Sequence, residues 1–284
     1  MEQTNREAYV AELKEKQKKL RSYLSGLKSA AVAFSAGIDS TFLMHSAREV
    51  LGDKAVAVTA RSCIFPEDEQ KEAEDFCKAY GIKHFIFDSG ELSLEEFSKN
   101  PPNRCYICKS RMLKMIKYIA DTNGISNVVE GSNIDDESDY RPGMAAINEL
   151  GIKSPLRIAE MTKNDVRALS KIAGLAAWNK PSFACLASRF PYGERITKDK
   201  LFAVERAERL LRGLGFCGAR VRIHGTAARI EISAAEFDKI TETQTRLKVA
   251  EELHAYGFSY VSLDLDGYRQ GSMNEVLNLE TGSK

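Results

Sequence analysis

The chain has 284 residues, of which 43% are hydrophobic and 29% charged, and its formal net charge at pH 7 is +1. This composition is typical of a soluble globular protein with one large domain, or with a domain of about 180 residues plus a smaller one. It gives no electrostatic argument for nucleic acid, and no apolar run approaches the ~20 residues of a membrane span. The charged N-terminus lacks the apolar core of a signal peptide. We therefore expect a cytoplasmic protein whose six cysteines are reduced and available for metal or redox chemistry.

The first half of the chain alternates predicted helices with short apolar strands. An amphipathic helix is expected over residues 2–28. Buried strands are expected at 31–34, 55–59, 84–87 and 127–130, and helices from the first strand to about residue 50 and at 67–80, 91–98 and 105–122. Strands separated by such helices predict a doubly wound parallel α/β sheet, which binds ligands at the carboxyl ends of its strands.

The pattern changes after residue 193. Thr197 is expected to cap a helix over 198–212, and two alternating strands at 219–224 and 228–232 form a predicted hairpin. A helical stretch to Ala255 and a strand at 260–265 would complete a small α+β domain. We place the domain boundary near residue 195, giving domains 1–194 and 195–284, the smaller one for substrate binding or oligomerisation.

A loop of small residues joins the first strand to the next helix. It consists of Ser35, Ala36, Gly37, Ile38, Asp39 and Ser40. Small side chains let backbone N–H groups approach an anion, and the helix N-terminus adds partial positive charge. An ordinary capped turn is the alternative. We interpret the loop as a pyrophosphate cradle, with Asp39 as a candidate Mg²⁺ ligand.

The acidic segment 131–143 follows the fourth predicted strand and should reach the same edge of the sheet. It begins at Gly131 and includes Asp139 and Arg141. A solvated loop is the ordinary interpretation. The functional one is that its carboxylates hold Mg²⁺ on a triphosphate while Arg141 binds a phosphate oxygen.

The cysteines form a third candidate site. Cys105 and Cys108 make a CxxC at a helix start, and Cys185 comes 77 residues later (185 − 108). A lone CxxC indicates a redox pair or half a zinc site, whereas three thiolates suit a [4Fe–4S] cluster with one open iron. Lys109 could neutralise these thiolates, hold a phosphate, or be a solvated charge. The remaining thiols, Cys63, Cys77 and Cys217, are expected to be structural.

Arg220 and Arg222 alternate with Val221 and Ile223 in the first hairpin strand, so the two arginines share one face. A solvated sheet face is the default interpretation. A clamp on a substrate phosphate is the functional one.

The chain resembles the ATP pyrophosphatases of the PP-loop family in its SAGIDS loop, where Ala36 replaces a glycine and resists positive φ. Within that family it is similar to the LarE-type ATP-dependent sulfur transferases. That similarity lies in DYRPG at 139–143, TKNDVRAL at 162–169, WNKP at 178–181, SRFPYG at 188–193 and the arginine hairpin. The resemblance implies a PP-loop domain, a small α+β domain, and a homo-oligomer. It also implies adenylation of pyridinium-3,5-biscarboxylic acid mononucleotide by ATP with Mg²⁺, and replacement of AMP by sulfur to give thiocarboxylates for the nickel-pincer nucleotide.

The resemblance also implies roles for single residues. One branch of the family sacrifices a cysteine that corresponds to Ala184 here, while the other holds a [4Fe–4S] cluster that binds hydrosulfide from a sulfide source. Residues expected to serve catalysis are Cys105, Cys108, Cys185, Lys109, Asp39, Ser188 and Arg189. Residues expected to bind the substrate phosphate are Arg220, Arg222 and Glu208.

Three rival functions stay open at this point. A PP-loop enzyme of tRNA thiolation uses similar cysteines, but the chain lacks the basic run that predicts a nucleic-acid face. An iron–sulfur carrier would need no loop for a leaving group. An amide-forming ligase would need no trio of cysteines.

Overall fold

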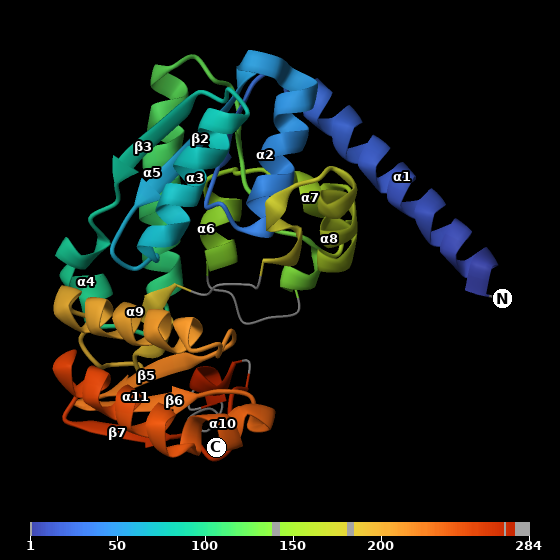
Figure 1. The fold of residues 1–284 in the computed structure, drawn as a ribbon. Coiled ribbons are helices and arrows are strands. Elements are labelled where there is room, and N and C mark those ends of the chain that lie inside the picture. The colour runs from blue at the N-terminus through green and yellow to red at the C-terminus, as the bar shows by residue number, and fades with distance from the viewer. Residues whose placement is uncertain (1, 138–142, 181–184, 270, 276–284) are drawn as a thin grey trace, which may run out of the picture. The chain divides into compact units, whose positions relative to one another are not determined.

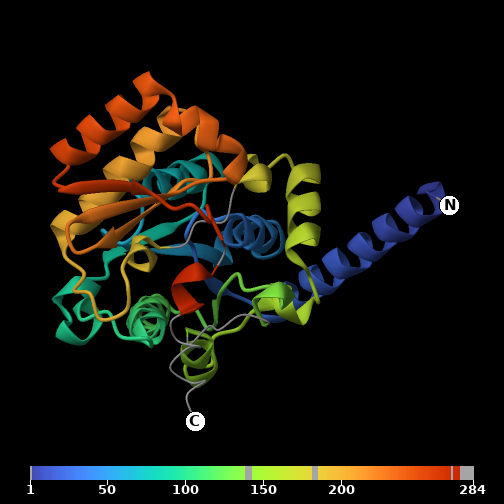
Figure 2. The same cartoon turned by 90° about the horizontal axis from the view of Figure 1, so that it is seen from below.

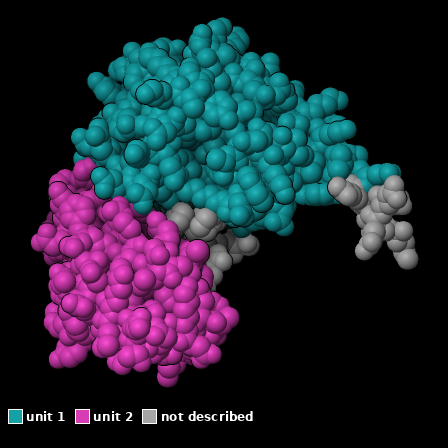
Figure 3. Space-filling view, viewed as in Figure 1, with its two compact units in different colours: residues 1–62, 67–89, 105–183 teal, residues 63–66, 90–104, 184–284 magenta. Residues whose placement is uncertain are grey.

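The computed structural model describes residues 2–137, 143–180, 185–269 and 271–275. The chain divides into two compact units (Figure 3). Unit 1 comprises residues 1–62, 67–89 and 105–183, and unit 2 comprises residues 63–66, 90–104 and 184–284. The boundary near residue 195 stays a prediction about independently folding domains.

Unit 1 is built on a four-stranded parallel sheet in the order β3-β2-β1-β4 (Figure 1). The strands are β1 (Ala30–Ala33), β2 (Ala55–Arg61), β3 (His84–Asp88) and β4 (Val128–Val129). The predicted α/β fold with a parallel sheet is confirmed. Because the strand order reverses between β1 and β4, the loops that follow these two strands flank the point where such sheets bind ligands.

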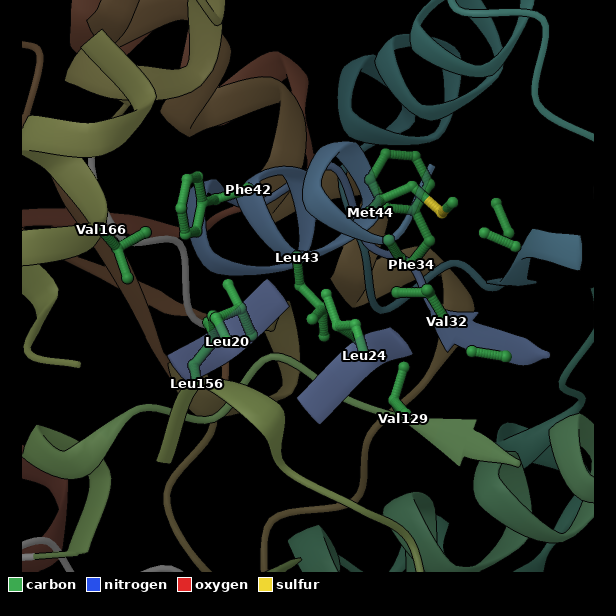
Figure 4. Close-up of a cluster of buried hydrophobic side chains, with 14 of the residues drawn as sticks. Leu20, Leu24, Val32, Phe34, Phe42, Leu43, Met44, Val129, Leu156 and Val166 are labelled. Carbon is green, nitrogen blue, oxygen red and sulfur yellow. The ribbon is translucent and has the colours of Figure 1, made fainter. Parts of the chain in front are cut away.

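Helices cover both faces of this sheet, because alternate strand residues are buried on opposite sides. On one face Val32 packs with Leu24, Leu43 and Val166 in a cluster of buried apolar side chains (Figure 4). On the other face Ala31 belongs to a second cluster. The helices of unit 1 are α1 (Glu2–Gly26), α2 (Ile38–Leu51), α3 (Glu67–Ala79), α5 (Arg104–Thr122), α6 (Gly143–Glu149), α7 (Pro155–Ile158) and α8 (Lys163–Ile172). α1, α2, α3, α7 and α8 contribute to the first cluster, and α5 and α6 to the second.

Unit 2 contains a mixed sheet in the order β5-β6-β7 (Figure 2). The predicted hairpin is confirmed, since β5 (Arg220–His224) and β6 (Ala227–Glu231) pair antiparallel, and β7 (Tyr260–Leu263) adds parallel to β6. Its helices are α4 (Glu95–Ser98), α9 (Lys198–Gly213), α10 (Phe237–Thr241) and α11 (Thr243–Ala255). α9 contacts β5 and α11 contacts β7. The Thr197 hydroxyl caps α9 as expected, accepting the Lys200 N–H at 3.4 Å.

The early segment 90–104 belongs to unit 2, and within it Asn100 is completely buried. Its side-chain amide donates to the carbonyl oxygens of Phe190, at 3.3 Å, and Pro191, at 2.6 Å. Arg104 donates to the Asn100 side-chain oxygen at 2.9 Å and lies 4.3 Å from the centre of the Tyr192 ring. Among the described residues, none of the helices combines the length and the apolar character needed to cross a bilayer.

Candidate functional site

Two serines of the SAGIDS loop, Ser35 and Ser40, form hydrogen bonds within the loop. The hydroxyls of Ser35 and Ser40 lie 3.1 Å apart, and the Ser40 hydroxyl donates to the Gly37 carbonyl at 3.1 Å. Gly37 is the N-cap of α2 and has no side chain with which to cap it. Backbone N–H groups of the first helical turn are therefore left to donate to another acceptor, as in an anion site.

Ala36 adopts the left-handed backbone conformation, with φ of +54°, and is buried. The expected resistance of alanine to positive φ therefore does not prevent this geometry. A left-handed residue other than glycine costs about 1–2 kcal/mol, so the surroundings must compensate for it.

A lysine beyond α8 contacts this residue. The Lys180 ammonium donates to the Ala36 carbonyl oxygen at 3.3 Å and forms ion pairs with two acids of α3, Glu72 and, at 4.0 Å, Glu69. Arg167 fixes the backbone around this lysine by donating to the Lys180 carbonyl at 3.0 Å. The loop is thus tied to two further elements of unit 1.

Asp39 lies in the first turn of α2, and both of its carboxylate oxygens are engaged. Oδ1 accepts the Asn133 side-chain N–H at 3.1 Å, and Oδ2 forms an ion pair with the Lys163 ammonium. The backbone N–H of Lys163, at the start of α8, donates to Asp135 at 2.8 Å. These contacts join the loops after β1 and β4 to α8 at the switch point of the sheet.

Gly131 packs against the backbone of the SAGIDS loop. A Cβ at this position would lie 2.9 Å from the Ser40 nitrogen and 3.1 Å from the Asp39 carbonyl carbon. These contacts leave no room for a side chain, so glycine is required here by close approach of the two loops.

The CxxC occupies the first turn of α5, where Cys105 is exposed and Cys108 is buried. Lys109 follows, and its ammonium lies 3.6 Å from the Glu130 carboxylate. Glu130 is itself buried and accepts the Ser132 hydroxyl at 2.7 Å. The described partner of Lys109 is therefore a carboxylate, which the sequence interpretations did not include.

A buried bidentate ion pair organises unit 2. Nε and Nη2 of Arg189 donate to the two oxygens of Glu208, each at 2.8 Å, and the side chains are only 1% and 6% exposed. The Val221 N–H donates to Glu208 at 3.0 Å. Burial alone would raise the pKa of Glu208, yet its pKa is lowered because Arg189 stabilises the carboxylate. Burial likewise opposes the charge of Arg189, whose pKa is nevertheless raised by Glu208.

The two hairpin arginines, Arg220 and Arg222, lie next to this ion pair and form a charged cluster with it, called the arginine cluster below. Arg222 donates to Glu231 at 3.0 and 2.9 Å, and to the Ser188 carbonyl at 2.9 Å. Arg189 donates to the Ser188 hydroxyl at 2.8 Å. Arg220 and Arg222 are 7% and 5% exposed, so the default interpretation of a solvated face is wrong.

The charge balance of this cluster favours an anion. Three buried arginines (189, 220 and 222) face two buried glutamates (208 and 231). The pKa of Arg220 is lowered, chiefly by burial and then by the neighbouring charge of Arg189. Such a cluster suits a phosphate or a carboxylate ligand.

Comparison with known proteins gives the family. Over 269 residues the chain is 39% identical to the pyridinium-3,5-bisthiocarboxylic acid mononucleotide synthase of Lactiplantibacillus plantarum, covering 94% of this chain and 97% of that protein. The chain belongs to the family of this synthase. A protein from Synechocystis is 40% identical over 265 residues, which cover 93% of this chain and 99% of that protein. A protein from Methanocaldococcus jannaschii is 28% identical over 243 residues, which cover 85% of this chain and 91% of that protein. No family model matches the chain.

This membership confirms the LarE resemblance drawn from the motifs. Of the residues expected to act in a synthase of this family, unit 1 gathers the SAGIDS loop, Asp39 and Gly131 at one edge of the sheet, and unit 2 gathers Ser188, Arg189, Glu208, Arg220 and Arg222. Asp139, Arg141 and Ala184 lie outside the described residues. Both carboxylate oxygens of Glu208 accept hydrogen bonds from Arg189, so Glu208 is the counterion of this arginine.

The three cysteines of the expected cluster belong to different units of this synthase-family chain. Cys105 and Cys108 are one helical turn apart in unit 1, at a helix N-terminus that favours thiolates, and Cys185 is half-buried in unit 2. In the described part of the chain, no three His, Cys, Asp or Glu side chains gather as a metal site. The donor chemistry of three reduced thiols fits an iron–sulfur cluster, and a lone carboxylate such as Asp39 fits Mg²⁺, which keeps waters and phosphates as its other ligands.

Several side chains of the site were missed by sequence reasoning. They are Glu130, Asn133, Lys163, Lys180 and Glu231. Two carried a usable signal: Glu130 directly follows the apolar pair of β4, and Asn133 falls in the segment after it. An acid in such a buried place needs a polar partner.

Proposed function

We propose that this protein catalyses ATP-dependent sulfur insertion into pyridinium-3,5-biscarboxylic acid mononucleotide. The observation that carries the proposal is the 39% identity, across nearly the whole chain, to a synthase of the corresponding bisthiocarboxylic acid mononucleotide. The substrate carboxylate would attack ATP at the α-phosphorus, releasing pyrophosphate and forming an acyl-adenylate. Hydrosulfide would then attack the acyl carbon, releasing AMP and a proton and leaving a thiocarboxylate. The second carboxylate would react in the same way.

The SAGIDS loop would serve the activation step. Its uncapped N–H groups and the α2 N-terminus supply donors for the phosphates, and such groups stabilise charge that develops on a leaving pyrophosphate. Mg²⁺ bound at Asp39 would neutralise that charge. Asp139 and Arg141 stay predicted residues of this site from the sequence alone. Asp39 would first have to release Lys163 or Asn133.

The arginine cluster of unit 2 would bind the phosphate of the substrate mononucleotide. Arg220 and Arg222 project from one strand face, and Arg222 is already oriented by Glu231. Arg189 and Ser188 complete the cluster, with Glu208 holding Arg189 in place. Preoriented guanidinium groups suit phosphate because less side-chain freedom is lost on binding.

The sulfur source would be external to the polypeptide. Ala184 replaces the cysteine that one branch of the family sacrifices, so this chain would turn over many times. A [4Fe–4S] cluster on Cys105, Cys108 and Cys185 would supply hydrosulfide when bound. Lys109, beside Cys108 and paired with Glu130, would place a positive charge near the incoming anion.

Anaerobic turnover tests this function. The reconstituted protein is incubated with ATP, the biscarboxylic acid mononucleotide and sulfide, and thiocarboxylate products are measured by mass spectrometry. We expect Cys108→Ala to lose at least a hundredfold in rate and Cys217→Ala, a change of an exposed thiol, to act as wild type. Equal rates for both variants would refute the role of the iron–sulfur cluster. Tight tRNA binding at ~0.15 M salt, with no product from the mononucleotide, would favour tRNA thiolation instead.

A further inference from the structure

Lys180 reaches the SAGIDS loop at its left-handed residue. Its ammonium donates to the carbonyl oxygen of Ala36, 144 residues away in sequence, at 3.3 Å. The lysine side chain is only 14% exposed, and its ammonium forms ion pairs with two acids of α3, Glu69 and Glu72. Arg167 fixes the backbone carbonyl of Lys180. The ammonium is therefore a fixed group of unit 1 and not a mobile surface charge.

This contact determines where the next backbone N–H points. In a trans peptide, the C=O of one residue and the N–H of the next point in opposite directions. Because the Ala36 carbonyl points toward Lys180, the Gly37 N–H points away from the lysine. There it meets the Ser35 hydroxyl at an N···O distance of 3.5 Å, at the long limit of a hydrogen bond. An anionic phosphate oxygen is a stronger acceptor for such an N–H.

We propose that Lys180 is a positioning residue of the nucleotide site, which holds Ala36 in the left-handed conformation and so directs the Gly37 N–H toward the phosphates of ATP. Lys180 acts through the peptide between Ala36 and Gly37 and does not itself contact the nucleotide. Alanine needs such support at this position because only glycine adopts positive φ without cost. This inference rests on the proposed ATP site.

A coupling experiment tests the proposal on the full chain, with α,β-methylene-ATP as the probe and isothermal titration calorimetry as the readout. We expect Lys180→Met to weaken binding at least tenfold and Lys180→Arg, which keeps a charged donor, to stay within threefold of wild type. Adding Ala36→Gly to Lys180→Met should recover at least threefold, because glycine reaches the required conformation unaided. Lys171→Met removes the same charge from a lysine that stacks on Trp178 at 4.5 Å and should bind as wild type.

The outcomes separate three explanations. An equal loss from Lys180→Met with alanine or with glycine at position 36 would mean a purely electrostatic effect and would overturn the positioning role. A lowered melting temperature with unchanged affinity would also overturn it, because it would mark a merely structural residue. A wild type that does not bind the probe would refute the ATP site itself, and this inference with it.

Discussion

Ala36 illustrates which part of a site is visible in a single residue. Its place in the SAGIDS string predicts a phosphate-binding loop, because small residues between a strand and a helix let backbone N–H groups approach an anion. Its left-handed conformation was not predictable, since alanine disfavours it. The supporting contact comes from Lys180, which the sequence places 144 residues later. The local pattern thus predicts the loop, and only the fold shows which distant side chain contacts it.

The close approach of Gly131 to the loop predicts the effect of a single methyl group. Gly131→Ala would place a Cβ 2.9 Å from the Ser40 nitrogen, so the first turn of α2 must shift. We expect the affinity for α,β-methylene-ATP to fall about tenfold, which corresponds to about 1.4 kcal/mol. Calorimetric titration measures this. Gly26→Ala, where an added Cβ meets nothing within 4 Å, is the control and should not change the affinity.

The cysteines should differ sharply in reactivity when the protein carries no cluster. Cys77 lies in the first core cluster of unit 1, and burial raises the pKa of its thiol to about 12. At pH 8 it should stay unmodified by iodoacetamide in the folded protein, while the exposed Cys105 and Cys217 are alkylated within minutes. Peptide mass spectrometry before and after unfolding in urea measures this. Rapid labelling of Cys77 in the native protein would contradict its expected structural role.

At the level of elements, strand β5 shows how an alternating pattern can mislead. Arginines at every second position look like a solvated face, because charged side chains are seldom buried without partners. Here the partners exist, but Glu208 lies on α9 and Glu231 on the paired strand β6. Alternation predicted the strand and its two faces correctly. It could not predict burial, which depends on carboxylates brought in by the tertiary fold.

The short helices mark a second limit of sequence reasoning. The long helices and the strands of the sheet were predicted close to their observed bounds, since their apolar periodicity is strong. α6 and α7 were not assigned, because seven and four residues are too short to show a period. α8 carried a signal that could have found it. Thr162 and Asp165 form a reciprocal capping box at its start.

The buried pair between α9 and the Arg189 segment predicts a pH-dependent stability of unit 2. Because the folded-state pKa of Glu208 is below its ordinary value of 4.5, the carboxylate stabilises the fold above that pH. This contribution is lost as the pH falls through the lower, folded-state pKa. Glu208→Gln should therefore cost about 3–5 kcal/mol at pH 7, and the difference from wild type should shrink on acidification.

Urea unfolding between pH 7 and pH 3 measures this difference. The matched control is Glu95→Gln, because Glu95 and Arg195 form a pair of the same bidentate geometry, 2.8 and 2.7 Å, in an exposed position of unit 2. Solvent weakens such pairs, so the control should change stability little at any pH. A gap between wild type and Glu208→Gln that is constant with pH would contradict the assigned ionisation.

For the whole molecule, the two proposed ligands should stabilise different units. At a hundred times its dissociation constant a ligand adds about 2.7 kcal/mol to the state that binds it. We expect α,β-methylene-ATP to slow hydrogen exchange in peptides of α2 and β4, and the biscarboxylic acid mononucleotide to slow it in α9 and β5. Mass spectrometry of exchanged peptides measures both. Protection of β5 by the nucleotide alone would contradict the assignment of the arginine cluster to the mononucleotide.

The discontinuous course of unit 2 affects how the chain is made. Residues 90–104 leave the ribosome early, but the Asn100 amide and the Arg104 guanidinium also contact residues 190–192, which are made later. Pro191 lies 91 residues beyond Asn100 in the chain. At about 5–20 residues per second, synthesis of that stretch takes roughly 5–18 s. During that interval a completely buried asparagine and its neighbours are exposed, so this segment is where a nascent-chain chaperone would have most to protect.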